Sequence, residues 1–315
     1  MKILVTGSSG FIGYHLTQEL LRMNNQVIGI DSNNNYYSNK IKKKRLKKLE
    51  KLKNFTFYKI NIINKKKLDK VFKKHKPKIV FHLAGQPGVL YSLKNPKTYF
   101  INNVKATEAI CKISKKYNLK KFILGSSSSV YGDQKKFPIK ESSKINPKNP
   151  YAKTKYQSEK IVVKLLKNSN TKYTIFRFFT VYGPYGRPDM FIHKFLNSIK
   201  NNKKITLYNN GLNFRDFTYV DDVVKILALS HKIVTTNGIL NICRSNPIKT
   251  THLVNLFKNF YKKDFRIKKI GVVKGEMLKT HGCNKLLKKN FKKIKFTNIR
   301  VGLKKTVSTF IKYGY

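Results

Sequence analysis

The chain has 315 residues and a formal net charge of +54, from 68 Lys and Arg against 14 Asp and Glu. The charge does not indicate nucleic-acid binding as a primary role, because lysine is spread along the chain and Lys, Asn and Ile, which share A/T-rich codons, are abundant together. No apolar run reaches the roughly 18 residues of a membrane span, and strand-like sequence rather than a signal peptide begins the chain, so we expect a cytoplasmic protein without membrane or specific nucleic-acid partners.

The first segments predict a dinucleotide site. An apolar strand at residues 3–6 is followed by Gly7, Gly10 and Gly13, and then by a helix at 14–23. Glycines let the backbone approach a pyrophosphate, and the helix N-terminus offers N–H groups and positive potential. A second strand, at 26–30, ends at Asp31, 18 residues after Gly13. A carboxylate there suits a ribose 2′-hydroxyl and repels a 2′-phosphate, so NAD is favoured over NADP.

The following segments continue the alternation of strands and helices. Further strands are predicted at 55–58, 79–83, 122–125 and 173–178, and helices at 40–53, 96–117 and 150–167. This pattern predicts an α/β fold with a Rossmann-type doubly wound parallel sheet. Beyond about residue 180 the pattern becomes irregular. We expect residues 1–180 to form an NAD-binding domain, to which part of the later chain returns, and 181–315 to form mainly a smaller mixed α/β substrate-binding lobe.

Tyr151 and Lys155 are the candidate catalytic pair. Their i, i+4 spacing places both side chains on one face of a helix. An ammonium near a phenol favours the phenolate and lowers a pKa that is otherwise about 10. The polar run from Ser126 to Ser129 precedes them and could bond the same substrate oxygen. The pattern is typical of an active site that removes a proton from a hydroxyl group.

The three cysteines, Cys111, Cys243 and Cys283, are widely separated and form no C-x-x-C. This spacing fits a reducing cytosol and predicts neither a disulfide framework nor a zinc site. The histidines show no metal spacing either, so we expect no metal.

Several runs together resemble the extended short-chain dehydrogenase/reductase superfamily, in its nucleotide-sugar epimerase branch. They are TGSSGFIG at 6–13, HLAGQ at 82–86, SSSSVYG at 126–132, PYAKTK at 150–155 and RDFTYVDD at 215–222. Within that branch the chain is most similar to UDP-glucuronate 4-epimerases. That likeness rests on DSNNNYY at 31–37, QPGVLYSL at 86–93 and RFFTVYGPYGRPDM at 177–190.

The resemblance implies a redox epimerisation of a UDP-sugar on permanently held NAD. Tyr151 takes the proton from the sugar O4, Lys155 keeps Tyr151 ionised and bonds the nicotinamide ribose, and Ser127 orients O4 with help from Ser128. The C4 hydride passes to NAD, leaving a transient 4-keto sugar, and returns to the opposite face. The resemblance also implies a homodimer formed by two long helices per subunit and a role in polysaccharide biosynthesis.

The resemblance also assigns binding residues. The implied cofactor contacts are Gly7, Gly10, Phe11, Ile12, Gly13, Asp31, Asn61, Ile62, Leu83, Ala84, Gly85, Asn103, Tyr151, Lys155 and Phe179. The implied substrate contacts are Gln86, Ser127, Ser128, Tyr151, Thr180, Arg187 and Arg215, with Arg187 as the partner of a uronate carboxylate. Two positions depart from the family pattern, since Asn61 replaces an Asp that contacts adenine and Leu90 replaces an Arg.

Residues also separate the alternatives. A 4,6-dehydratase needs an acid and a base beside the active-site serine, and Ser128 and Ser129 cannot do that proton work. A neutral UDP-sugar 4-epimerase acting on glucose or N-acetylglucosamine stays open because of Leu90. A catalytically silent NAD-binding regulatory protein with a polyanion-binding surface is the alternative from another class.

Overall fold

The computed structural model describes residues 1–233, 237–261, 265–272 and 277–314. The chain forms two compact units. The first comprises Met1–Gly132, Lys144–Phe178 and Val224–Leu240, and the second comprises Asp133–Ser143, Phe179–Val223 and Asn241–Tyr315. Helix α9 (Val220–Ile233) and strand β11 (Gly238–Ile242) each contribute residues to both units.

The first unit is built on a seven-stranded sheet of order β11-β6-β5-β4-β1-β2-β3. The neighbours from β3 to β6 pair in parallel. The strands of this sheet besides β11 are β1 (Lys2–Thr6), β2 (Gln26–Asp31), β3 (Phe55–Lys59), β4 (Ile79–His82), β5 (Lys121–Ser127) and β6 (Lys172–Phe178). Helices α1 (Phe11–Arg22), α2 (Asn39–Glu50), α3 (Lys65–His75), α4 (Val89–Lys94), α5 (Pro96–Tyr99), α6 (Ala106–Lys116) and α7 (Pro150–Leu166) connect the strands, with a π-helical turn η1 (Phe100–Lys105) and a 3-10 turn η2 (Ser128–Tyr131).

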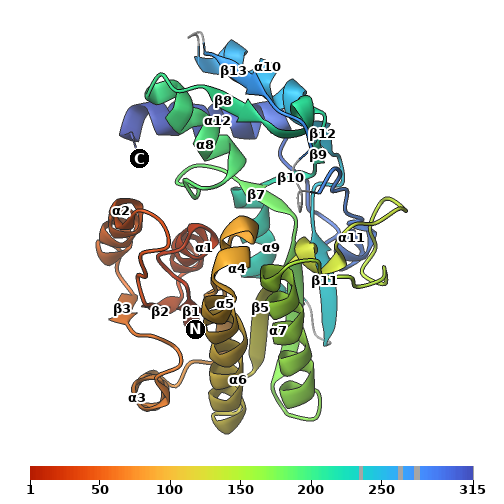
Figure 1. The fold of residues 1–315 in the computed structure, drawn as a ribbon. Helices are drawn as coiled ribbons and strands as arrows, with labels where there is room; N and C mark the ends of the chain where they lie inside the picture. Colours follow the sequence, from red (N-terminus) through yellow and green to blue (C-terminus); the bar gives the residue numbers. More distant parts are fainter. Residues whose placement is uncertain (234–236, 262–264, 273–276, 315) are drawn as a thin grey trace. The chain divides into compact units, whose positions relative to one another are not determined.

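One layer of the core explains how helices cover the sheet. Leu4 lies opposite Ile28 and Val80, and Val80 lies opposite Phe122, so four neighbouring strands present apolar side chains at one level. Side chains of α3, α6 and α7 join the same core; examples are Phe72, Ile110 and Val162. Helices α6 and α7 lie side by side (Figure 1). This packing fixes the carboxyl ends of the strands, where the loops that could bind ligands begin.

The second unit has a separate core and shorter strands. Its helices α8 (Phe191–Lys200), α10 (Thr250–Tyr261) and α12 (Ile299–Tyr313) share that core, in which the rings of Phe195 and Phe257 stack with centroids 4.1 Å apart. The parallel pairs are β7 (Thr180–Tyr182) with β10 (Phe217–Tyr219) and β8 (Ile205–Leu207) with β13 (Ile267–Lys269); β9 (Phe214–Arg215) and β12 (Ile248–Lys249) are antiparallel. The 3-10 turn η3 (Tyr208–Gly211) and helix α11 (Lys285–Asn290) complete the unit.

The predicted α/β fold with a parallel Rossmann-type sheet is confirmed, and the predicted strands lie within one or two residues of the observed ones. Three helices differ from expectation. The helix expected over 40–53 is α2, which ends at Glu50. Helix α1 begins at Phe11 rather than at residue 14, since Gly10 is its N-cap. The helix expected over 96–117 contains the π-helical turn Phe100–Lys105, which sequence periodicity does not reveal.

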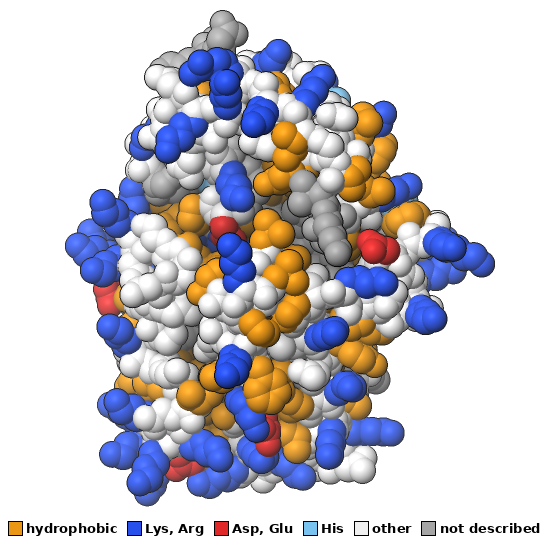
Figure 2. Space-filling view, in the orientation of Figure 1, with side chains coloured by type: hydrophobic (Ala, Val, Ile, Leu, Met, Phe, Trp, Pro, Cys, Tyr) orange, Lys and Arg blue, Asp and Glu red, His pale blue; other side chains and the backbone are white. Residues whose placement is uncertain are grey.

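Basic side chains are scattered over the surface rather than gathered into one patch on the face in Figure 2. Within the part of the chain that the structure describes, no helix combines the length and apolarity needed to cross a membrane.

Candidate active site

The glycine loop after β1 is tightly packed and offers a site for an anion. Gly7 has φ +73°, and a Cβ there would lie 2.8 Å from the backbone nitrogen of Ala84. A Cβ on Gly13 would lie 2.0 Å from the carbonyl oxygen of Gly7, so helix and loop can meet only without side chains. Gly10 has no side chain to cap α1, and the buried hydroxyls of Ser8 and Ser9 have no hydrogen-bond partner among the described residues. The loop therefore fits a dinucleotide pyrophosphate.

Asp31 lies beside this loop at the end of β2. Its Oδ2 accepts a hydrogen bond from the Ser9 backbone N–H at 3.1 Å, and its Oδ1 accepts one from the Asn33 N–H at 2.8 Å. Each carboxylate oxygen keeps a further lone pair for a ribose hydroxyl.

Asn61 and Ile62 lie just after the end of β3. Asn61 is exposed, and its Oδ1 accepts a hydrogen bond from the Ile63 N–H at 3.3 Å. Ile62 is buried.

His82 joins the loops after β1 and β4, a role that the sequence did not suggest. Its Nδ1 lies 2.8 Å from Thr6 Oγ1, and its Nε2 lies 3.1 Å from Thr107 Oγ1. Thr6 Oγ1 also accepts from the Ala84 N–H at 3.2 Å. Burial lowers the pKa of His82 to about 3, and the charge of Lys155 adds to that effect, so the ring is neutral. These bonds hold the segment Leu83–Gly85 against the glycine loop.

Asn103, in the π-helical turn η1, ties the loop after β4 to helix α7. Its Oδ1 accepts from the Gln86 backbone N–H at 2.7 Å. Its Nδ2 donates to the Gln86 carbonyl at 3.2 Å and to Thr154 Oγ1 at 3.0 Å. The Thr154 hydroxyl in turn donates to the carbonyl of Tyr151 at 2.9 Å. Asn103, in the π-helical turn, thus joins Gln86 and the backbone of Tyr151, the candidate base, in one hydrogen-bond network.

Tyr151 lies in the first turn of α7. Asn149 caps this helix by accepting from the Ala152 N–H at 2.9 Å, and Pro150 occupies the first helical position. The first turn of a helix lies at the positive end of its dipole. The ring of Tyr99 packs edge-on against that of Tyr151, with centroids 6.1 Å apart.

Lys155 lies one turn after Tyr151 on α7, and Ser127 belongs to the same unit. Lys155 Nζ donates to the Gly125 carbonyl at 2.5 Å, near the end of β5. Burial lowers the pKa of Lys155 to about 8, against an opposing effect of Glu159. Ser127 ends β5 and its Oγ accepts from the Ser129 N–H at 3.2 Å; Ser128 begins η2. Since the Lys155 ammonium can still donate two more hydrogens, it can bond a phenolate or a ribose hydroxyl.

A buried ion pair supports this region and was not predicted. Glu159 lies one turn after Lys155, and its Oε2 is 2.7 Å from Arg177 Nη2 of β6. Ser126, the neighbour of Ser127, donates to Glu159 Oε1 at 2.5 Å. Arg177 Nη1 also donates to the Tyr131 hydroxyl at 3.0 Å. The pair therefore fixes the end of β5 against α7.

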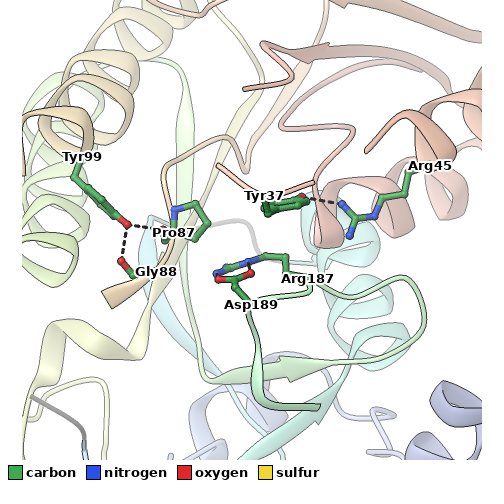
Figure 3. A network of polar contacts seen from close by, with 7 residues as sticks. All are labelled: Tyr37, Arg45, Pro87, Gly88, Tyr99, Arg187 and Asp189. Carbon is green, nitrogen blue, oxygen red and sulfur yellow. Dashed lines mark hydrogen bonds and ion pairs between the residues drawn. The ribbon is translucent and has the colours of Figure 1, made fainter. Parts of the chain in front are cut away.

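The remaining predicted residues belong to the second unit. Thr180 begins β7, and its N–H donates to the Asp216 carbonyl at 3.2 Å; Phe179 is buried. Arg187 forms a bidentate pair with Asp189, with Nε–Oδ1 at 3.0 Å and Nη2–Oδ2 at 2.5 Å (Figure 3). Arg215 Nη1 donates to the carbonyl of Phe214 at 3.0 Å. The Arg187 guanidinium thus already holds a carboxylate, that of Asp189.

Comparison with known proteins places these features in a family. A family model described as NAD dependent epimerase/dehydratase family matches residues 3–243. Protein CapI of Staphylococcus aureus is 37% identical over 99% of both chains. A protein named UDP-glucuronate 4-epimerase from Thermodesulfobacterium geofontis is 33% identical over 97% of this chain and 94% of that protein. The crystal structure of a Bacillus cereus UDP-glucuronic acid 4-epimerase, in complex with UDP-glucuronic acid and NAD, has a TM-score of 0.94 at 30% identity over 100% of both chains.

The parallel sheet, the glycine loop and Asp31 define a dinucleotide-binding enzyme of the short-chain dehydrogenase/reductase type. The chain belongs to the NAD dependent epimerase/dehydratase family. It is an NAD-dependent epimerase and therefore an isomerase.

Proposed function

We propose that this enzyme interconverts UDP-glucuronate and UDP-galacturonate by redox epimerisation at C4. The observation that carries the proposal is the placement of Tyr151 in the first turn of α7, with Lys155 one turn later and Ser127 at the neighbouring strand end. The similarity to proteins named UDP-glucuronate 4-epimerase supports the choice of substrate. The first unit would bind the dinucleotide and carry the base, and the second would contribute Thr180, Arg187 and Arg215 as contacts to the sugar nucleotide.

The proposed proton chemistry follows from the side chains. Tyr151, as phenolate, accepts the proton of the sugar O4 while the Lys155 ammonium and the helix N-terminus stabilise its charge. Ser127 donates to or accepts from O4 and sets its direction. NAD, when bound, takes up the C4 hydride and returns it. Because Tyr151 would give the proton back on the return step, the reaction needs no external acid, and because the hydride would be returned to C4, it needs no external oxidant.

The proposed cofactor contacts follow the loops already described. The glycine loop and the first turn of α1, with Phe11 and Ile12, would bind the pyrophosphate, and Asp31 would accept from the adenine ribose. Asn61 and Ile62 lie at the next strand end, where an adenine would be bound. Leu83, Ala84, Gly85, Asn103 and Phe179 are the further predicted contacts.

Arg187 would bind the uronate carboxylate, and the Thr180 hydroxyl would donate a further hydrogen bond to it. Arg215 would bind the pyrophosphate of the substrate. The arginine fork suits a carboxylate, as its pairing with Asp189 illustrates. The substrate must therefore share Arg187 with Asp189 or displace it. Arg187→Ala should weaken UDP-glucuronate binding roughly tenfold to a hundredfold and affect UDP-glucose much less.

The same residues make a neutral UDP-sugar 4-epimerase the second candidate. Leu90 stands where the family carries Arg and is 56% exposed, and Arg187 is already paired with Asp189. Equal losses for UDP-glucuronate and UDP-glucose in Arg187→Ala would favour this alternative.

The base is tested by Tyr151→Phe, which removes the acid–base oxygen and keeps the ring. We expect turnover to fall by roughly a hundredfold or more while bound NAD stays unchanged. Unchanged turnover would contradict the role of Tyr151. A protein that lacks turnover before mutation but holds NAD would instead be a silent binding protein.

We also propose a homodimer that works in the cytoplasm. Phe100 and Ile101 are each 43% exposed at the start of the helical segment that continues into α6, beside α7. A second copy could cover these apolar side chains. Light scattering should show a dimer for the unaltered chain and a monomer for Ile101→Lys.

The cysteines support the proposed cytoplasmic location. The thiols of Cys111, Cys243 and Cys283 are buried and free in the described chain, as is usual for proteins of a reducing compartment.

A further inference from the structure

The side chain of Gln86 ends in a buried donor that has no protein partner. Gln86 is 2% exposed, and its Nε2 has no hydrogen-bond partner among the described residues. Its backbone is fixed on both sides by Asn103, as described above. A buried N–H without an acceptor is costly, so this donor fits an acceptor that a bound ligand supplies.

The orientation of that amide depends on a chain of contacts that begins at Lys42. Lys42 Nζ, on α2, lies 2.8 Å from Asn34 Oδ1 and 2.6 Å from the Asn34 carbonyl. Asn34 Nδ2 donates to Gln86 Oε1 at 3.2 Å. Lys42 is only 5% exposed, and its ammonium lies 4.6 Å from the ring centroid of Tyr37, so it is held in place.

Hydrogen-bond chemistry allows only one arrangement of the two amides. An ammonium can only donate, so Asn34 must turn its oxygen toward Lys42 and its NH₂ toward Gln86. Gln86 must then meet that NH₂ with Oε1, and its own NH₂ becomes the unpartnered end. Asn34 is itself exposed, and its Oδ1 accepts a second, longer hydrogen bond from the Tyr36 backbone N–H at 3.4 Å. The Lys42 ammonium, at 2.8 Å, is the shorter and charged partner, so Lys42 and the Tyr36 N–H together determine which end of the Gln86 amide is available.

The residue that precedes Gln86 lies beside Lys155, the candidate partner of the base. A Cβ on the adjacent Gly85 would lie 3.9 Å from Lys155 Nζ and 2.9 Å from Asn103 Oδ1. We propose that Lys42 and Asn34 are positioning residues that present the Gln86 NH₂ to an oxygen of a bound nucleotide. That oxygen is a phosphate or hydroxyl acceptor of either the dinucleotide or the sugar nucleotide. The inference rests on the proposed function only in the choice of UDP-glucuronate as a probe.

Asn34→Asp is the sharpest test. The new carboxylate still accepts from Lys42 but cannot donate to Gln86, so the Gln86 amide turns and donates its NH₂ to that carboxylate instead of to the ligand. The thermal midpoint should stay close to that of the unaltered protein. Affinity for one nucleotide should fall roughly tenfold or more, the effect of losing a hydrogen bond to a charged group. Lys42→Met removes the shorter hydrogen bond to Asn34 Oδ1 and keeps the longer one from the Tyr36 N–H, so it should cause a smaller loss of the same affinity.

Asn35→Asp is the matched control, because it adds the same charge one residue away and Asn35 bonds Asn39 rather than Lys42 or Gln86. The readouts are the NAD content of the purified protein, the dissociation constant of NAD, and that of UDP-glucuronate on the NAD-loaded protein. A loss confined to NAD identifies the dinucleotide as the acceptor, and a loss confined to UDP-glucuronate identifies the sugar nucleotide. In a Gln86→Met background, Asn34→Asp should add nothing.

The inference is overturned if Asn34→Asp binds both nucleotides as Asn35→Asp does, or if its effect persists unchanged in the Gln86→Met background. Binding constants do not depend on turnover. A protein that binds the nucleotides but fails to convert UDP-glucuronate would count against the proposed function and leave this test intact.

Discussion

Replacing His82 should change how the stability of the protein depends on pH. The ring is 1% exposed, and burial lowers its pKa to about 3, against an ordinary value of 6.5. The unfolded chain therefore takes up a proton below pH 6.5 that the folded chain refuses. Stability must fall as pH drops through 6.5, and the loss continues toward pH 3.

The size of the effect follows from the two pKa values. Linkage between pH 7.5 and pH 5 gives a loss of about 2 kcal/mol attributable to this one group. His82→Gln keeps polar atoms that can bond the hydroxyls of Thr6 and Thr107 but cannot be protonated in this range. The variant should be less stable than the unaltered protein at pH 7.5, because its fit is poorer, and should recover about 2 kcal/mol relative to it by pH 5.

Urea unfolding followed by circular dichroism suits the measurement, since the chain contains no tryptophan. The quantity to compare is the difference in free energy of unfolding between the two proteins at pH 7.5, 6.5, 5.5 and 5. Carboxylates and other histidines titrate in both proteins and cancel in that difference. A difference that stays constant over this range would refute a neutral buried ring at position 82.

Three further predictions concern other buried or paired charges. Burial raises the pKa of Asp216 to about 6 from an ordinary value of 3.8. The contribution of this carboxyl to the free energy of unfolding therefore falls as pH rises from 3.8 through 6. In urea unfolding, the protein should lose about 2 kcal/mol of stability relative to Asp216→Asn between pH 4 and pH 7.5. Glu159→Gln should lower the free energy of unfolding by about 3–5 kcal/mol, because Arg177 is left buried without its ion pair. Adding Arg177→Met should restore much of that stability in the same urea unfolding experiment. Asp189→Asn should lower the KM for UDP-glucuronate severalfold but not that for UDP-glucose, because Arg187 loses a competing carboxylate; an equal change for both substrates would contradict competition at Arg187.

Local patterns made the sheet and the nucleotide loop predictable. The strand, the glycines at Gly7, Gly10 and Gly13, and the acid at Asp31 follow one another within a short stretch, and each has a geometric reason for its position. Parallel strands end at one edge, so the residues after β1, β2, β4 and β5 could be expected to lie together. Tyr151 and Lys155 share a helix and needed only its period.

Contacts between residues far apart in the sequence could not be predicted from local patterns. His82 lies in an apolar strand, so its burial could be expected, but its bonds to Thr6 and Thr107, which are 76 and 25 residues away, could not be predicted from its neighbours. Lys42 stands in a run of lysines, a residue type that mostly faces solvent, yet it is buried against Asn34 and Tyr37. The pair of Arg187 with Asp189 is local, but sequence alone could not tell whether the arginine would be held by the chain or left for a ligand.

The most direct test of redox epimerisation is the fate of the hydrogen on C4. Purified protein, with no added NAD, would be incubated with UDP-glucuronate deuterated at C4 in ordinary water, and the products would be separated and analysed by mass spectrometry. We expect UDP-galacturonate that retains the deuterium, because the hydride leaves C4 and returns to it without exchanging with water. Product that has exchanged its deuterium for solvent hydrogen, or the absence of any C4 epimer, would contradict it.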